Sequence, residues 1–338
     1  MDFGFIIEQT FSQAFGPLAM VFAIAAIGLN FHFGYGGLLN FGQVGFMAAG
    51  AYGVGMAVVW LEWGFWWGIV LGFGYSIGLA VLLGIPTLRL RADYLAITTI
   101  AASETVRLFV RWRGNDGRTG AAEGINDFAD DFYDLSIFTK TGGDAYEFGP
   151  FRYLADDMWV LLVGWSIVGL LLLLTWQLMR SPWGRVVRAI REDEDAARAL
   201  GKNAYSYKMQ VLLIGGVIGG IAGMMQAISN QSVQPDTFNP VITFMIWTAL
   251  IVGGAGRIWS PVAGAMIFWG LLSFCENVLR QALDTDSGAE WLDRLFNLTV
   301  FNVSQVRFML VGLTLMLLMR FRPQGIFGSR EEMALDDR

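Results

Sequence analysis

Covalent chemistry and metal binding have few candidate residues in this 338-residue chain, which contains one histidine, His32, and one cysteine, Cys275. A zinc site needs three or four histidine, cysteine or carboxylate ligands, so a multi-histidine metal centre is excluded. Nucleophilic catalysis needs a base within hydrogen-bond reach of the nucleophile, and these two residues are far apart in the sequence. We predict that the chain is not an enzyme and binds no metal ion. We interpret both residues as packed or interfacial side chains.

Nucleotide binding is not predicted either. The phosphate-binding pattern Gly-x-x-x-x-Gly-Lys-Ser/Thr does not occur, and the triplet Gly-Lys-Asn at 201–203 lacks both the hydroxyl and the upstream glycine. We therefore predict no ATP site and no cofactor in this chain. If the chain moves a solute, it does so downhill or takes its energy from another chain that binds ATP.

The elements that position the remaining residues are predicted to be membrane-spanning helices. Hydrophobic residues make up 55% of the chain and charged residues 15%, against about 25% charged in a soluble domain. A helix needs about 20 apolar residues to cross a bilayer. We predict an all-α polytopic membrane protein with about eight or nine transmembrane helices, in which residues 1–338 form one domain. The apolar runs are 17–31, 43–60, 66–88, 94–110, 158–179, 209–229, 241–256, 262–282 and 305–320.

The distribution of charge predicts the orientation of these helices. Residues 113–157 contain ten acidic and four basic side chains, whereas short basic segments follow the third, fifth, seventh and ninth runs. Because short cytoplasmic loops are enriched in lysine and arginine, we predict an acidic external loop at 113–157, a cytoplasmic segment at 180–208 and a cytoplasmic tail at 321–338. The N-terminus is then external. The net charge of −6 argues against nucleic acid as a partner.

Glycine is concentrated in residues 34–55, which hold eight glycines. Two interpretations stay open: a broken helix that lines a substrate path, as in transporters with discontinuous helices, or close packing between helices. A second glycine pattern, in which glycine recurs every four residues from 215 to 223, predicts close helix packing. The candidate path residues are Gly37, Asn40, Gly42, Gln43, Gly45 and Glu104.

Two pairs of opposite charges lie within the apolar runs. Glu104 and Arg107 are three residues apart, and Glu276 and Arg280 are four apart, so each pair can form on one helix face. Charged groups inside a membrane are costly to bury and are candidates for function. The two pairs are either ion pairs near the outer interface or a polar lining for a charged substrate.

The segment 180–208 is helical by composition but too polar to span a membrane. It starts at Ser181-Pro182 and ends at Gly201, which suit the two ends of a helix. Asp193 falls on the apolar face, which predicts a break near 192–195 with an acidic residue capping a second short helix. Such an element either lies on the membrane or docks in a partner's groove. One predicted face carries Val186, Ile190, Ala197 and Leu200, and another carries Arg185, Arg188 and Arg191.

Several segments, taken in order, resemble the permeases of bacterial ATP-binding-cassette importers, specifically the branched-chain amino-acid permease family (LivM/LivH type). The closest match is 181–201, with its Arg-Ala-Ile-Arg-Glu-Asp-Glu run from 188 to 194. The chain departs from the family at Ser260, where glycine is usual, and in the length and acidity of the loop 113–157. The other matching segments are 34–42 with 50–52, 88–97 with Glu104 and Arg107, 119–125, 253–256, 261–265 and 322–325.

The resemblance implies a permease subunit of the bacterial plasma membrane, surrounded by lipid, that moves branched-chain amino acids inward by alternating access. It implies two ATPase subunits, a second homologous permease or a copy of this chain, and a periplasmic or lipid-anchored substrate-binding protein. The alternatives are a urea or short-chain amide importer of the same family, and a passive channel or secondary carrier. The residues expected to transmit ATPase motion are Arg185, Val186, Arg188, Ile190, Arg191, Glu192, Ala197, Leu200 and Gly201.

Overall fold

The computed structural model describes residues 3–88, 92–112, 114, 116–138, 145–148 and 151–283, with single positions and short stretches between 309 and 328. Helices make up most of this part. They are α1 (Phe3–Phe15), α2 (Pro17–Leu29), η1 (Asn30–Tyr35), α3 (Gln43–Val59), α4 (Phe65–Thr87), α5 (Ala92–Arg111), α6 (Asp116–Thr119), α7 (Asp130–Tyr133), α8 (Ala155–Arg180), α9 (Pro182–Glu192), α10 (Glu194–Ala199), α11 (Ala204–Asn230), η3 (Pro235–Phe238), α12 (Pro240–Gly253) and α13 (Ser260–Leu283). The strands are β1 (Ile125–Asn126), β2 (Ala145–Phe148), β3 (Phe151–Leu154) and β4 (Ser232–Val233).

Five helical stretches in the described part are long and apolar enough to cross a membrane. Two further apolar helices, α3 and α12, are shorter. The prediction of a mostly helical, polytopic fold is confirmed. The number of eight or nine spans stays a prediction, because most of the run at 305–320 and most of the tail at 321–338 lie outside the described residues. The five stretches are Pro17–Tyr35, Phe65–Thr87, Ala155–Arg180, Ala204–Asn230 and Ser260–Gln281.

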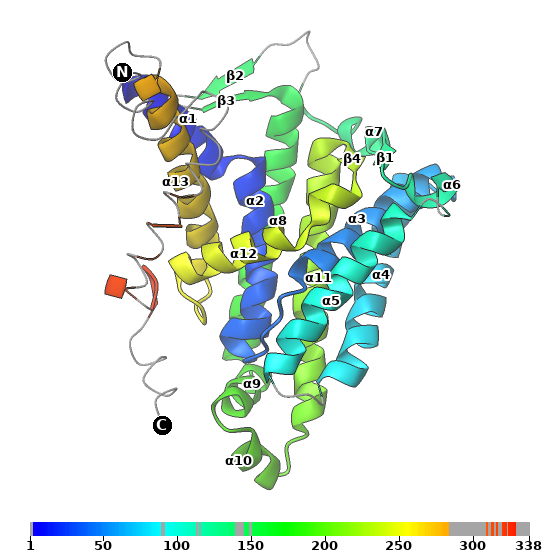
Figure 1. Cartoon of the computed structure of the whole chain (residues 1–338), viewed down its shortest axis with the longest axis vertical. Coiled ribbons are helices and arrows are strands. Elements are labelled where there is room, and N and C mark those ends of the chain that lie inside the picture. The colour runs from blue at the N-terminus through cyan, green and yellow to red at the C-terminus, as the bar shows by residue number, and fades with distance from the viewer. Residues whose placement is uncertain are drawn as a thin grey trace.

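The centre of the bundle is formed by α2, α3 and α11 (Figure 1). Every residue of α2 from Ala19 to Leu29 is buried. Glycine brings the backbones of α3 and α11 into contact, since a Cβ on Gly50 would lie 2.3 Å from the carbonyl oxygen of Gly220. A Cβ on Gly223 would likewise lie 1.9 Å from that of Met47. The predicted close packing of the 215–223 glycines is therefore confirmed, and it occurs within the chain.

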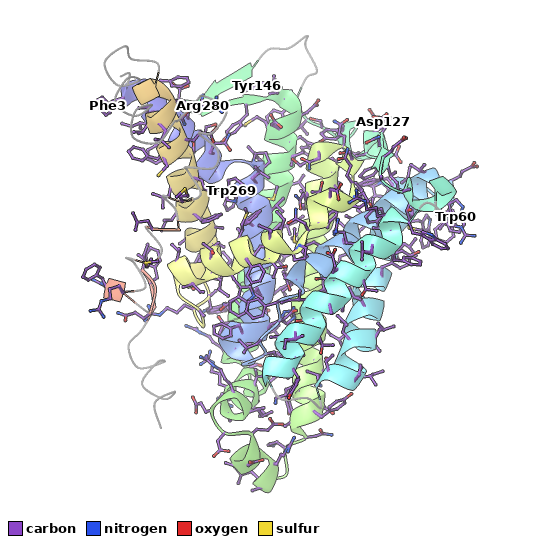
Figure 2. The ribbon with its side chains drawn as sticks, in the orientation of Figure 1. Phe3, Trp60, Asp127, Tyr146, Trp269 and Arg280 are labelled. Atoms are coloured by element: carbon purple, nitrogen blue, oxygen red, sulfur yellow. The ribbon has the colours of Figure 1, made fainter. Side chains whose placement is uncertain are left out.

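The surface of the bundle exposes large apolar side chains that a soluble monomer would cover. Trp66, Trp67 and Leu82 of α4 are 56%, 64% and 68% exposed. Trp60 projects near the α3 end of this surface, with the guanidinium carbon of Arg118 4.8 Å from its ring centroid (Figure 2). Such a surface suits a protein surrounded by lipid.

The two ends of the bundle differ in structure (Figure 1). Helices α9 and α10 lie at one end, and α6, α7 and the strand pairs lie at the other. At this second end β1 pairs with β4 through Ile125 and Val233, and β2 pairs with β3. The Tyr133 hydroxyl donates to the Ile228 carbonyl at 2.9 Å. The part of the expected external loop from Ile125 to Tyr133 is therefore folded onto the end of α11, and the described part of the chain stays mostly helical beside these short strands.

Candidate functional site

The first feature of the site is a widened helical turn, η1, which continues α2 into the glycine-rich stretch. The backbone N–H of Gly36 donates to the Phe31 carbonyl at 3.1 Å, five residues back, as in a π-helix. Glycine permits this geometry, because a Cβ on Gly34 would lie 1.9 Å from the side-chain oxygen of Asn30. The chain then runs without regular structure to α3, through positions that are mostly buried. Irregular backbone at membrane depth requires such enclosure by protein.

A buried polar cluster of His32, Asn40 and Gln43 lies where this segment meets α11, and all three side chains are 0% exposed. His32 Nε2 lies 3.1 Å from the Leu212 carbonyl oxygen, and its Nδ1 lies 2.9 Å from Asn40 Nδ2. Asn40 Nδ2 also donates to Gln43 Oε1 at 3.3 Å, and Gln43 Nε2 donates to the Gly215 carbonyl at 3.3 Å. The structure thus joins two of the predicted path residues to a histidine that the sequence analysis interprets as incidental.

Helix α12 closes over this cluster. The Trp247 indole N–H donates to the Asn40 carbonyl at 3.0 Å, and the Thr243 hydroxyl accepts from the backbone N–H of Val44 at 3.0 Å. The ring of Phe41 stacks on Trp247 with their centroids 4.8 Å apart. The bond from Val44 satisfies an N–H that the start of α3 leaves without an intrahelical partner, and the bond from Trp247 satisfies a buried loop carbonyl. Side chains of the short helix α12 therefore hold the start of the short helix α3 and the loop before it inside the bundle.

The predicted path residues Gly42 and Gly45 contact α5. A Cβ on Gly42 would lie 2.3 Å from the Thr99 carbonyl oxygen, and a Cβ on Gly45 would lie 2.9 Å from Ser103 Cβ. The Thr99 hydroxyl also accepts a hydrogen bond from the backbone N–H of Phe41 at 3.0 Å. Both glycines thus allow α3 and the loop before it to lie close to α5. Their contact points on α5, Thr99 and Ser103, are about one helical turn apart.

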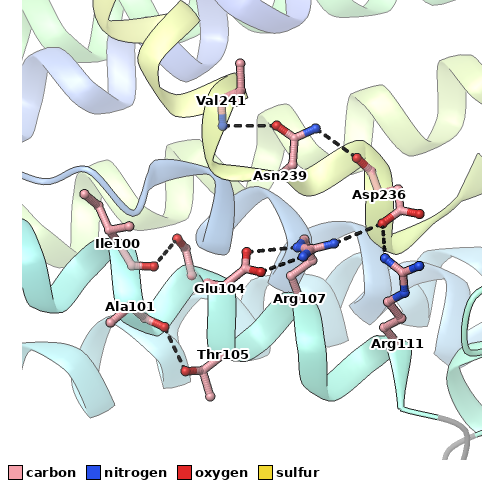
Figure 3. Close-up of polar contacts among 10 residues, drawn as sticks. Ile100, Ala101, Glu104, Thr105, Arg107, Arg111, Asp236, Asn239 and Val241 are labelled. Atoms are coloured by element: carbon pink, nitrogen blue, oxygen red, sulfur yellow. Dashed lines mark hydrogen bonds and ion pairs between the residues drawn. The ribbon is translucent and has the colours of Figure 1, made fainter.

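Glu104, the remaining predicted path residue, belongs to a separate charged group (Figure 3). Arg107 donates to both carboxylate oxygens of Glu104, at 2.5 and 2.9 Å, which confirms the predicted pair. Arg107 also donates to Asp236 Oδ1 at 2.9 Å, and Arg111 donates to the same oxygen at 2.7 Å. Asn239 donates to the Asp236 carbonyl at 3.1 Å and caps α12 by accepting from the N–H of Val241. The group therefore ties α5 to the start of α12.

Asp236 and Trp247 were not identified by the sequence analysis. Asp236 lies 129 residues from Arg107, and no local spacing relates the two. The only sequence signal is the Asn239-Pro240 pair, which is typical of a helix start and which does begin α12. The second predicted ion pair, Glu276 with Arg280, is confirmed at 2.8 Å on α13.

The segment predicted to be cytoplasmic folds as two helices, α9 and α10, as predicted from the position of Asp193. Ser181 caps α9 by accepting from the N–H of Gly184 at 3.4 Å. Asp193 has an extended backbone and caps α10 by accepting from the N–H of Ala196 at 2.9 Å. Gly201 follows α10 with φ +77°, which glycine adopts without strain.

The expected continuous apolar face on this segment is wrong. Ile190 and Ala197 are 3% and 5% exposed, and they pack with Ala204 at the start of α11 in a small core bordered by Val186 and Tyr207. Leu200, by contrast, is 81% exposed. The physical reason is the end of α10, because Leu200 is the C-cap of this six-residue helix and lies outside the small core that Ile190 and Ala197 form from the two sides of the break.

Two of the three expected coupling arginines bind this chain itself. Arg191 Nη1 donates to the Gly34 carbonyl, and its Cγ would lie 3.1 Å from a Cβ on Gly37. Arg188 donates to the Met179 carbonyl at 3.4 Å, and its guanidinium carbon lies 6.0 Å from the ring centroid of Tyr35. The Arg185 side chain is exposed and, within the described part of the chain, makes no hydrogen bond or ion pair; Glu192 is exposed as well.

These contacts connect the predicted substrate path in the glycine-rich stretch with the predicted coupling segment on α9. The glycine-rich stretch carries Gly37 against α9, the buried cluster against α11 and α12, and Gly42 and Gly45 against α5. No covalent chemistry is suggested by this arrangement. It is an irregular, glycine-rich backbone segment held between helices, and such a junction suits a movement of the helices relative to one another.

Comparison with known proteins supports a transport role. A family model described as "Branched-chain amino acid transport system / permease component" matches residues 17–304. The chain is 32% identical over 257 residues to the high-affinity branched-chain amino acid transport system permease protein LivM of Salmonella typhimurium, covering 74% of this chain and 60% of that protein. It is 25% identical over 343 residues to a probable LivM permease of Methanocaldococcus jannaschii, covering 90% of each. The L-arabinose transport system permease protein AraH of Escherichia coli is 28% identical over 207 residues, 60% of this chain and 56% of AraH.

The family model and the LivM relatives cover different shares of the sequences compared. The alignment spans about 60% of the length of the bacterial LivM proteins, so their substrates do not transfer directly to this chain. The family model, however, covers most of the residues from α2 to beyond α13. The chain belongs to the family of branched-chain amino acid transport permeases.

Proposed function

We propose that this chain is the transmembrane permease subunit of an ATP-driven importer for branched-chain amino acids in a bacterial inner membrane. It would move substrate inward by alternating access and would not hydrolyse ATP itself. Two separate ATP-binding-cassette subunits would supply the energy. Family membership supports the class of transporter, and the LivM relatives support the substrate.

One observation carries the mechanism: α9 is bonded to the glycine-rich stretch through Arg191 and Gly34. Helix α9 lies at the end of the bundle, outside the helices long enough to cross a membrane (Figure 1). A force applied to α9 by a partner would therefore reach the interior of the bundle through a direct contact. A passive channel has no need of such an element.

The exposed side chains of α9 and α10 would meet the ATPase. Arg185, Glu192 and Leu200 are exposed, and an exposed leucine suits an apolar pocket on a partner. The inward-facing residues Ile190 and Ala197 would keep α9 and α10 rigid relative to α11, so that they move together.

The opposite end would face a periplasmic or lipid-anchored substrate-binding protein. Helix α7 there begins with Asp130 and Asp131. A second permease, homologous or identical to this chain, would complete the membrane part. The chain itself would cross the membrane eight or nine times, with α3, α5, α12 and the 305–320 run adding to the five long helices.

Reconstitution in liposomes tests the proposal. The permeases, ATPases and binding protein of one system are incorporated together, and uptake of radiolabelled leucine is followed with and without ATP. We expect uptake only with ATP and binding protein, and competition by isoleucine and valine. Uptake down a gradient by the isolated chain would favour a channel or secondary carrier. ATP-dependent uptake of urea or a short-chain amide, but not of leucine, would favour the alternative substrate class. Since AraH is also a relative, arabinose serves as a further substrate control.

A further inference from the structure

The widened turn η1 is a junction between four parts of the molecule. Its Gly34 carbonyl accepts from Arg191 of α9, and Tyr35 lies beneath Arg188. The Asn30 side chain donates to the Arg257 carbonyl at 3.0 Å and accepts from the N–H of Gly256 at 2.8 Å, in the turn between α12 and α13. A movement of α9 would therefore act directly on this turn, in addition to its contacts with α8 and α11. A π-turn is rare and marginal, and such turns occur frequently at functional sites.

His32 lies within η1 and connects it to α11 and to the start of α3. The Leu212 carbonyl can only accept a hydrogen bond, so His32 Nε2 must carry the proton and Nδ1 must accept from the Asn40 amide. The Asn40 oxygen accepts from the N–H of Gly42 at 2.8 Å. One arrangement of donors and acceptors thus fixes the imidazole between three segments.

The His32 ring has little freedom to move independently. A Cβ on Gly215 would lie 2.3 Å from His32 Nε2, so the ring fills a notch that α11 leaves by having glycine there. The ring is fully buried, so bulk water does not reach it to replace a lost partner. A displacement of η1 must therefore carry α11 and Asn40 with it or leave buried polar groups unpaired.

We propose that His32 is a positioning residue of the transport cycle, which transmits movement of α9 from η1 to α11 and to the glycine-rich stretch. This inference rests on the proposed function. His32 touches neither substrate nor ATP in this role. It determines whether the movement that begins at α9 reaches the helices around the substrate path as one step.

The test measures coupling, which a purely structural role would not change. The complete complex is reconstituted with wild-type permease or with His32→Phe, His32→Gln or Thr175→Val. Radiolabelled leucine imported per ATP hydrolysed is then measured for each assembled complex. Phenylalanine keeps the ring volume and leaves Asn40 and Leu212 without their partner. We expect the amount of leucine imported per ATP to fall about tenfold, because the cost of leaving one buried polar group unpaired is enough to change an equilibrium by that factor.

The other two variants separate positioning from stability. Glutamine can still donate to the Leu212 carbonyl, so His32→Gln should retain more coupling than His32→Phe. Thr175→Val removes a buried hydroxyl that donates to Leu171 at 2.7 Å in α8, outside this route, and should keep the wild-type ratio. An unchanged ratio in His32→Phe, whatever the yield of complex, would overturn the inference. An equal fall in Thr175→Val would overturn it too.

A surface variant covers the case in which His32→Phe does not assemble. Arg191→Leu removes the donor to Gly34 from an exposed position, and Arg191→Lys keeps a donor and the charge. We expect the leucine variant, and not the lysine variant, to lower leucine per ATP; equal, wild-type ratios would overturn the inference. If wild-type complexes show no ATP-dependent uptake, the proposed function itself fails. If wild type transports and the His32 and Arg191 variants stay coupled, only the inference fails.

Discussion

Arg191 on α9 donates a hydrogen bond to the backbone carbonyl of Gly34 in the widened turn that follows α2. The two residues are 157 positions apart, and the contact places α9, at the end of the bundle, directly on the backbone of the glycine-rich stretch. Because a backbone carbonyl cannot be removed by substitution, the arginine is the adjustable half of this contact.

Leu200 and Ile190 should respond differently to a carboxylate. Leu200 is 81% exposed, so Leu200→Asp should leave the unfolding temperature unchanged and weaken co-purification of the ATPase. Ile190 is 3% exposed, so Ile190→Asp should destabilise the α9–α10 core by several kcal/mol, because it buries an unpaired charge. Thermal unfolding and pull-down of the ATPase measure both effects. Leu200→Met is the matched control, and wild-type binding by Leu200→Asp would contradict the docking role.

Asp193 should determine the stability of α10 through its capping side chain. Asp193→Ala removes the acceptor for the Ala196 N–H and should destabilise the helix by about 1 kcal/mol. Asp193→Asn keeps a capping oxygen and should behave like wild type. Hydrogen exchange of the amides at 196–199 should rise in the alanine variant alone, together with a fall in substrate-stimulated ATP hydrolysis. Equal exchange in the two variants would show that the cap is dispensable.

Gly42 and Gly78 should differ in their tolerance of alanine. A Cβ on Gly42 would lie 2.3 Å from the Thr99 carbonyl oxygen, so Gly42→Ala should push α5 away and destabilise the protein by about 1–3 kcal/mol. Gly78 on α4 has open space at this position, so Gly78→Ala should stabilise its helix by up to about 1 kcal/mol.

Thermal unfolding and leucine uptake together distinguish the two interpretations of Gly42. If Gly42→Ala loses stability and uptake in equal measure, the glycine serves helix packing. If uptake falls while stability is kept, the glycine lines the substrate path.

Glu104 and Asp236, the two carboxylates of the charged group, should contribute unequally to the stability of the protein. The Glu104 carboxylate holds Arg107, whose side chain is 16% exposed, so Glu104→Gln should destabilise the protein by about 1.5–3 kcal/mol. The Asp236 side chain is 62% exposed, so Asp236→Asn should have an effect of less than about 1 kcal/mol. Unfolding at low and high salt checks the assignment, since salt should reduce the Asp236 effect more. A larger loss in Asp236→Asn than in Glu104→Gln would reverse the assignment.

The two ends of the bundle should be accessible from opposite sides of the membrane. Asp130→Cys and Ala199→Cys, each in a Cys275→Ser background, place one thiol at an exposed position at each end. Ala199 is preferred to Ala197, which is buried. A membrane-impermeant maleimide should label Asp130→Cys in intact cells and Ala199→Cys only in inverted vesicles. Labelling of both from one side would rule out the proposed topology.

The sequence by itself determined the class of fold and the local structure of the segment that forms α9 and α10. Apolar run length predicted most of the long helices because crossing a bilayer sets a minimum length. Asp193 on the apolar face was enough to predict the break between α9 and α10, since capping is a local interaction. The Glu104–Arg107 pair followed from a spacing of three residues for the same reason.

Only the tertiary structure decided which distant residues meet. Asp236 completes the Glu104–Arg107 pair from 129 residues away, and Leu212 gives His32 a partner from 180 residues away. It also turned Ile190 inward and left Leu200 exposed, although both are apolar residues of one short segment. Helical periodicity specifies a face but not what covers that face. Coverage depends on the direction of the next helix, which is set by packing against the whole bundle.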